Sequence, residues 1–134
     1  MEFAEADLSN PLQILKCLEG INVVVQLVGT SNPSQQNNHI IRDIEENVIP
    51  HICCIEAAIK TGVKRYIFAS SGGAVYGLKS PNPTREEEAT NPLCSYGLNK
   101  LAVEKYLNMF SAVSKIESVV LRISNVYGPG QCVS

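Results

Sequence analysis

The stretch that decides the fold is residues 63–73, which read VKRYIFASSGG. Its first seven residues are rich in β-branched and aromatic side chains, which predicts a strand, and the serines and glycines after them predict a turn. Two other runs have the same form: residues 21–28 (INVVVQLV) end at Gly29, and residues 118–123 (SVVLRI) end at Ser124. The first of these two is nearly continuous in apolar residues, which is typical of a strand buried on both faces of a parallel sheet.

Helical patterns separate these strands. Between the first two, apolar residues recur in steps of three and four that trace one helix face, at positions 41, 44, 48, 52, 55 and 59, and Gly62 follows as a C-cap. Pro50 lies inside this pattern and removes a backbone donor, so we expect a kink or break within residues 47–50. A second helix is expected over residues 92–113, after a surface loop at 78–92. The alternation of strand and helix predicts an α/β fold, a Rossmann-like doubly wound parallel sheet with right-handed crossovers.

Length and composition narrow the classes of protein. The 134 residues are 45% hydrophobic and 18% charged, which predicts at most one ordinary globular domain. A net charge of −2 without a basic stripe argues against nucleic-acid binding. No apolar run approaches the ~20 residues of a membrane span, and the acidic N-terminus is unlike a signal peptide, so we expect a cytoplasmic protein with no membrane partner. His39 and His51 have no second ligand at metal spacing, so they are interpreted as ordinary polar residues and no metal is expected.

Small polar residues follow all three predicted strands. They are residues 29–31 (GTS), residues 70–73 (SSGG), and Ser124 with Asn125. Ligands of open α/β sheets bind at the carboxyl ends of the strands, where small residues let the backbone approach a ligand. Each segment alone is also explained as the ordinary end of a strand. Three of them on adjacent strands favour a binding edge.

Tyr96 and Lys100 form the sharpest chemical signal. They are four residues apart at the start of the second predicted helix, so both side chains lie on one face. A phenol has an unperturbed pKa near 10, and a nearby cation lowers that pKa, which would let Tyr96 act as a general acid–base. The same spacing also occurs where a lysine merely lies along a packed tyrosine, so the pair alone leaves both interpretations open.

Six segments, in order, extend this signal over nearly the whole chain: residues 7–10 (DLSN), 23–29 (VVVQLVG), 45–48 (EENV), 70–77 (SSGGAVYG), 95–104 (SYGLNKLAVE) and 121–131 (LRISNVYGPGQ). Together they resemble the extended short-chain dehydrogenase/reductase family, in particular its NAD-dependent sugar-nucleotide epimerases and dehydratases of the UDP-glucose 4-epimerase type. Six ordered motifs are far more specific than any one of them.

The resemblance implies NAD as the cofactor and a nucleotide-sugar as the substrate. The residues it implies for NAD are Asp7 (at the adenine), Leu8, Leu27, Val28, Gly29, Asn47, Ser70, Tyr96 and Lys100. Those it implies for the substrate are Gly72, Gly73 and Asn125. It also suggests a homodimer formed through the helix that carries Tyr96.

The implied chemistry takes place at a sugar carbon. Tyr96 would take the proton of a sugar hydroxyl while NAD accepts the hydride, and Lys100 would bind the nicotinamide ribose and lower the pKa of Tyr96. In an epimerase the keto-sugar then turns over and the hydride returns to its other face, whereas in a dehydratase water is lost first. Two alternatives remain open: a related reductase that acts on another carbonyl, and a truncated, non-catalytic remnant of such an enzyme.

The chain departs from the family pattern in two places. Gly72 stands where the family usually has a catalytic Ser or Thr. Ser71 is assigned as the substitute hydroxyl, with the alternative that a water or the sugar's own geometry suffices. A Gly72→Ser change is expected to leave turnover unchanged or to raise it. The glycine-rich turn that seats the pyrophosphate does not occur in the 134 residues, and neither does a substrate domain. We therefore expect residues 1–134 to form an incomplete NAD-binding Rossmann-type domain, which lacks the first strand–helix unit and the C-terminal substrate domain.

Overall fold

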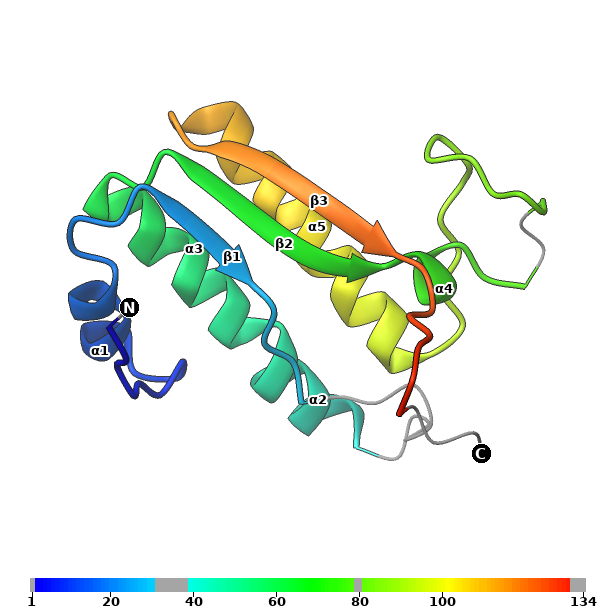
Figure 1. Ribbon diagram of the computed structural model, residues 1–134, viewed down its shortest axis with the longest axis horizontal. Coiled ribbons are helices and arrows are strands. Elements are labelled where there is room, and N and C mark those ends of the chain that lie inside the picture. The colour runs from blue at the N-terminus through cyan, green and yellow to red at the C-terminus, as the bar shows by residue number, and fades with distance from the viewer. Residues whose placement is uncertain (1, 31–38, 79–80, 131–134) are drawn as a thin grey trace.

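The computed structural model describes residues 2–30, 39–78 and 81–130. In chain order, the elements are α1 (Pro11–Cys17), β1 (Val23–Gln26), α2 (Ile40–Asn47), α3 (Ile49–Thr61), β2 (Arg65–Ser71), α4 (Gly72–Val75), α5 (Ser95–Val113) and β3 (Glu117–Ile123). The strands form a parallel sheet in the order β1-β2-β3 (Figure 1). This arrangement confirms the predicted Rossmann-like parallel sheet.

The register brings the carboxyl ends of the strands to one edge. Gln26 of β1 pairs with Phe68 of β2, and Ser71 of β2 pairs with Ile123 of β3. The first strand is shorter than expected, since it covers Val23–Gln26 and not the whole of residues 21–28. The small polar segments predicted to form a binding edge therefore follow strands that all point the same way.

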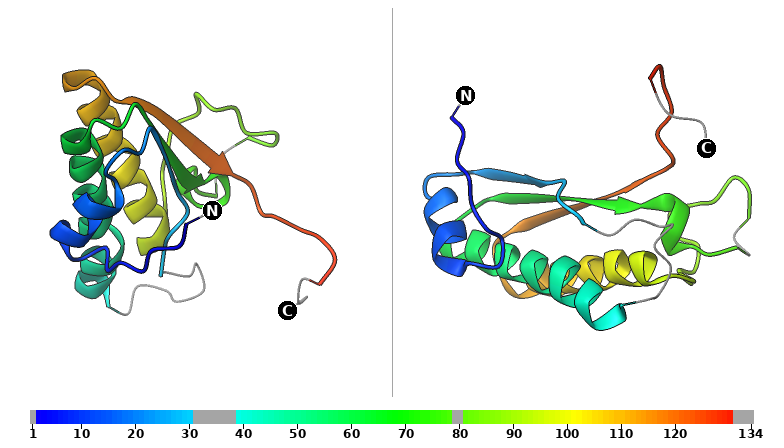
Figure 2. Two further views of the ribbon diagram at one scale, coloured as in Figure 1. Left: turned by 60° about the vertical axis from the view of Figure 1, so that its left-hand side comes forward. Right: turned by 90° about the horizontal axis from the view of Figure 1, so that it is seen from below.

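The helices lie against one face of the sheet (Figure 2). Tyr66 and Phe68 of β2 face this layer and are fully buried, and they pack in the core with Ile55 of α3 and with Val103 and Leu107 of α5.

The opposite face of the sheet is open. Val23 and Val25 of β1 are 48% and 55% exposed. The expectation that this strand is buried on both faces is therefore wrong for the described chain, because the described helices cover one face only.

The long helical pattern is broken where the proline predicted a break. α2 ends at Asn47 and α3 begins at Ile49, with Val48 between them. Pro50 lies in the first turn of α3, where the missing backbone donor costs nothing. Gly62 ends α3 with a left-handed backbone (φ 80°), as the C-cap prediction required.

Two short helices were not predicted. The first is α1, whose cap is Asn10: its side-chain oxygen accepts from the backbone N–H groups of Leu12 and Gln13 at 3.2 and 3.3 Å. The second is α4, a single turn that directly follows β2. It lies close to the start of α5, where a Cβ added at Gly97 would be 2.7 Å from the carbonyl oxygen of Ala74.

This close approach predicts the effect of adding one methyl group. Gly97→Ala should lower the free energy of unfolding by about 1–3 kcal/mol, because α5 must move away from α4. The matched control is Gly128→Ala, where an added Cβ meets no described atom within 4 Å. Urea unfolding of both variants measures the difference, and equal stabilities would show that the two helices are not in tight contact.

Candidate active site

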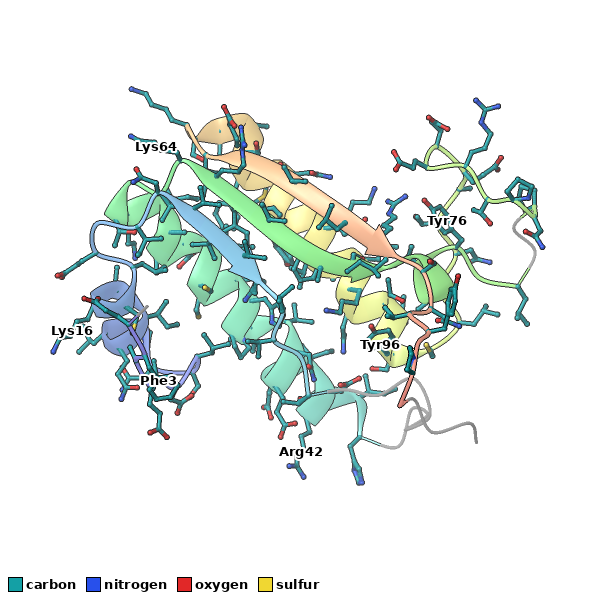
Figure 3. All side chains as sticks on the ribbon, viewed as in Figure 1. Phe3, Lys16, Arg42, Lys64, Tyr76 and Tyr96 are labelled. Atoms are coloured by element: carbon teal, nitrogen blue, oxygen red, sulfur yellow. The ribbon has the colours of Figure 1, made fainter. Side chains whose placement is uncertain are left out.

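Tyr96 and Lys100 occupy the first two turns of α5. Tyr96 lies at the end of the molecule toward which the strands point (Figure 3). The Nζ atom of Lys100 lies 5.9 Å from the centroid of the Tyr96 ring, so the two side chains converge as their spacing predicted. Nζ also donates to the carbonyl oxygen of Ala69 at 2.8 Å and lies 4.8 Å from the centre of the Phe68 ring. Burial lowers the pKa of Lys100. The ammonium group is thus held at the carboxyl end of β2.

The end of β1 meets this lysine. A Cβ added at Gly29 would lie 3.8 Å from Lys100 Nζ and 4.0 Å from Asn47 Oδ1. Asn47 is buried at the end of α2, and its Oδ1 accepts from the backbone N–H of Thr30 at 2.9 Å. Three of the residues implied for NAD, from the segment after β1 and from α2 and α5, therefore lie together.

Asp43 organises the same region, although the sequence reading did not single it out. Its carboxylate accepts a hydrogen bond from Ser95 Oγ, and Asn47 Nδ2 donates to its Oδ1 at 3.0 Å. The carbonyl of Asp43 is also 3.4 Å from Asn99 Nδ2. These contacts tie α2 to the first turns of α5, on both sides of Tyr96. A lone aspartate on a helix carries no sequence signal for such a role beyond its spacing of four residues from Asn47.

The turn after β2 places two of the residues implied for the substrate side by side. A Cβ added at Gly73 would be 3.1 Å from Asn125 Oδ1. Ser71 is the half-buried last residue of β2, and the catalytic role assigned to it stays a prediction.

The backbone of β3 passes close to Gly72. A Cβ added there would be 2.9 Å from the backbone carbonyl oxygen of Arg122, a separation that real Cβ atoms essentially never show. A serine at position 72 would therefore force β3 or the turn to shift, which argues against the expectation that Gly72→Ser is neutral or better; its effect on turnover stays a prediction.

Ser70 belongs to a buried ionic network that was also missed. Its hydroxyl donates to the carboxylate of Glu104, which is 2% exposed and also receives Arg122 Nη2 at 2.8 Å. Arg122 Nη1 in turn donates to Tyr76 Oη at 2.7 Å and to the carbonyl of Glu86 at 3.0 Å. The hydrogen bond with Glu104 raises the pKa of Arg122. The contact of Ser70 with NAD stays a prediction, since its hydroxyl is bound to Glu104.

The N-terminal segment forms a second part of the candidate site. Asp7 Oδ1 accepts from Ser9 N and Oγ at 2.8 and 2.7 Å, which lowers the pKa of Asp7. A hollow of about 420 Å³ is lined by Glu5, Ala6, Asp7 and Gln13. The half-buried Leu8 packs against the core, whereas Leu27 and Val28 after β1 are exposed. The NAD contacts implied for this set of residues stay predictions; the set is Asp7, Leu8, Leu27 and Val28.

His51 differs most from its sequence interpretation as an ordinary polar residue. It is 2% exposed, its Nε2 lies 3.0 Å from the carbonyl oxygen of Val28, and its ring meets Phe68 edge-on. Burial and the charge of Lys100 lower the pKa of His51 to about 4. The signal for burial was present, because position 51 falls between the apolar positions 48 and 55 on the same helix face.

Two kinds of site were not found in the described part of the chain. No group of three or more His, Cys, Asp or Glu side chains there could hold a metal ion. None of the helices there is both long enough and apolar enough to cross a membrane.

The parallel sheet, the small residues at its strand ends and the convergent tyrosine and lysine define a Rossmann-like domain of the short-chain dehydrogenase/reductase class. Residues 1–133 match the model of the NAD dependent epimerase/dehydratase family. The chain therefore belongs to this family.

Similar proteins support the assignment. The chain is 41% identical over 111 residues to the dTDP-4-dehydro-6-deoxyglucose reductase of Escherichia coli, a match that covers 83% of this chain and 35% of that protein. The UDP-glucose 4-epimerase of Thermotoga maritima, solved with UDP-glucose, superposes with a TM-score of 0.88 at 33% identity, over 97% of this chain and 43% of that one. The UDP-glucose 4-epimerase of Thermus thermophilus, solved with NAD, superposes with a TM-score of 0.83 at 29% identity. This match covers 95% of this chain and 42% of that one. The chain thus spans less than half the length of these relatives.

The ionic network predicts that the buried Arg122–Glu104 pair contributes far more to the free energy of unfolding than the exposed Arg65–Glu117 pair. Arg122→Met should cost about 3–5 kcal/mol of unfolding free energy, because it leaves the buried Glu104 carboxylate without a compensating cation. Adding Glu104→Leu to that variant should restore most of the loss. Arg65→Met is the matched control, because the Arg65–Glu117 pair is exposed and should contribute less than about 1 kcal/mol. Urea unfolding distinguishes these cases, and equal losses in Arg122→Met and Arg65→Met would contradict the assignment.

The lowered pKa of His51 predicts an acid-sensitive fold. An unfolded histidine titrates near 6.5, and folded His51 titrates at about 4, so between these values the unfolded chain binds more protons. Stability should therefore fall as the pH drops from about 6.5 to about 4, by on the order of 2 kcal/mol from this residue. Urea unfolding at several pH values should show a smaller fall in His51→Gln. Parallel curves for the two proteins would show that His51 titrates normally.

Proposed function

We propose that this chain carries the NAD-binding and acid–base part of an oxidoreductase-type epimerase or dehydratase that acts on a nucleotide-activated sugar. The observation that carries this proposal is the meeting of Tyr96, Lys100 and Gly29 at the carboxyl ends of the strands. The homologous Thermotoga maritima and Thermus thermophilus epimerases, which were solved with UDP-glucose and with NAD, supply the substrate and cofactor classes.

The residues present fit NAD. Gly29 has no side chain, and the atoms that an added Cβ would meet, Lys100 Nζ and Asn47 Oδ1, are polar. Such a position lets a ligand approach the backbone while a cation and an amide stay within reach. The hollow beside Asp7 provides room and a carboxylate for the adenosine end. When bound, NAD supplies the reversible two-electron redox chemistry that no side chain of this set can perform.

The chain's own residues supply acid–base chemistry and position. The phenolate form of Tyr96 takes the proton of a sugar hydroxyl and later returns it, and the ammonium group of Lys100 lies beside the Tyr96 ring. Lys100 also binds the nicotinamide ribose, from the place where its bond to Ala69 holds it. Gly73 and Asn125 contact the sugar nucleotide, and Ser71 offers a hydroxyl to the reacting oxygen.

Association through α5 is part of the proposal. Leu98 and Met109 of this helix are 55% and 48% exposed, which gives α5 an apolar outer side. Such a side favours a homodimer in which the helices of two copies pack together.

A reductase is the second candidate. The observation that favours it is the 41% identity to the dTDP-4-dehydro-6-deoxyglucose reductase. Such an enzyme would use Tyr96 as an acid toward a keto-sugar, with Lys100 in the same place. It differs from an epimerase in consuming reduced cofactor.

The roles of the two residues can be tested in a chimera where residues 1–134 replace the matching part of the Thermotoga maritima enzyme. Tyr96→Phe should lower turnover of UDP-glucose to its C4 epimer by about 10²–10⁴-fold, with unchanged NAD content, because only the acid–base hydroxyl is lost. Lys100→Ala should lower both turnover and NAD content. Tyr106→Phe, on the exposed side of the same helix, is the control.

More than half the turnover remaining in Tyr96→Phe would exclude the assigned role. Consumption of NADH with a 4-keto-sugar nucleotide, without epimerisation, would identify the reductase instead.

A further inference from the structure

His51 is a buried titratable group that the proposed chemistry does not use. Its Nε2 lies 3.0 Å from the Val28 carbonyl, which can only accept a hydrogen bond, so Nε2 carries the proton. Because burial keeps the imidazole neutral, Nδ1 must then be an acceptor. Nδ1 is buried and has no hydrogen-bond partner among the described residues. A buried polar atom of this kind normally has a partner, which is often an ordered water.

A small cavity adjoins this ring. It has a volume of about 10 Å³ and is lined by Asn47, His51, Tyr96, Asn99 and Lys100. A cavity of roughly this size holds one water when at least two polar groups can bind it. Every lining side chain is polar. The ammonium group of Lys100 has three donors, of which one is directed to Ala69, so a donor remains for the cavity.

We propose that one ordered water in this cavity donates to His51 Nδ1 and accepts from Lys100 Nζ. The water and the Ala69 carbonyl then fix two of the three N–H groups of Lys100, and the third is left for Tyr96 and the ligand. His51 is thereby a positioning residue that acts on Lys100 through the water. This role for His51 rests on the proposed function of Lys100, whereas the water site rests on geometry alone.

Two substitutions distinguish the roles of the two nitrogen atoms of His51. In His51→Asn, the side-chain oxygen takes the place of Nδ1 and keeps the acceptor. In His51→Gln, the amide takes the place of Nε2 and keeps the donor to Val28, but no acceptor stands at the position of Nδ1. Loss of a hydrogen-bonded partner of the ammonium group should lower the pKa of Lys100 further. We expect a fall of about one unit in His51→Gln and little change in His51→Asn.

The test uses the 134-residue chain itself, in two measurements. NMR titration of the Lys100 Nζ group in the three proteins should give the fall in His51→Gln only; equal values in both variants would overturn the proposal. A crystal structure should show one water within hydrogen-bond distance of both His51 Nδ1 and Lys100 Nζ. A dry cavity would overturn the proposal, and so would a direct bond from Gln26 Nε2, the other buried group without a partner in the described chain. Neither measurement uses turnover or bound NAD, so its failure is distinct from failure of the proposed function.

Discussion

The buried carboxylate of Glu104 is the constraint on which the arrangement of the site depends. A charge removed from water is tolerated only where other groups compensate it, and here the compensation comes from two different strands. Ser70 at the end of β2 and Arg122 in β3 both donate to Glu104 on α5. The same guanidinium reaches Tyr76 and the carbonyl of Glu86. One ionic group therefore joins both strands, the helix, and the segment after α4.

This constraint and the candidate chemistry share one helix face. Tyr96, Lys100 and Glu104 follow one another at intervals of four residues on α5, so all three face the same side. The contact of Glu104 with the sheet fixes the rotation of the helix, and this rotation directs Lys100 toward the carbonyl of Ala69. At the other end, Asp43 holds the first turn of α5 through Ser95. The reactive pair thus lies between an ionic anchor and a hydrogen-bonded anchor.

Periodicity and turn chemistry predicted most of the fold, because they are local properties. The strand runs, the break before Pro50 and the cap at Gly62 each follow from a few neighbouring residues. The open sheet face was not predictable in this way, because burial of Val23 and Val25 depends on which distant segments cover them. In the site, Tyr96 and Lys100 have a spacing that carries meaning in one helix. No such local spacing links Ser70, Glu104 and Arg122, since these residues become partners only once β2, α5 and β3 are packed together.

Packing also decides where a catalytic hydroxyl can stand. The family pattern expects it at position 72, but the backbone of β3 passes so close there that only glycine fits. A side chain at this position would press against the backbone carbonyl of Arg122, the residue whose guanidinium compensates Glu104. A hydroxyl at position 72 therefore requires a shift of the backbone of β3 or of the turn after β2. Ser71 is free of this conflict, because successive residues of a strand point to opposite faces, and its neighbour Ser70 is the one bound to Glu104. A hydroxyl supplied from position 71 is thus the arrangement that leaves the anchor of α5 undisturbed.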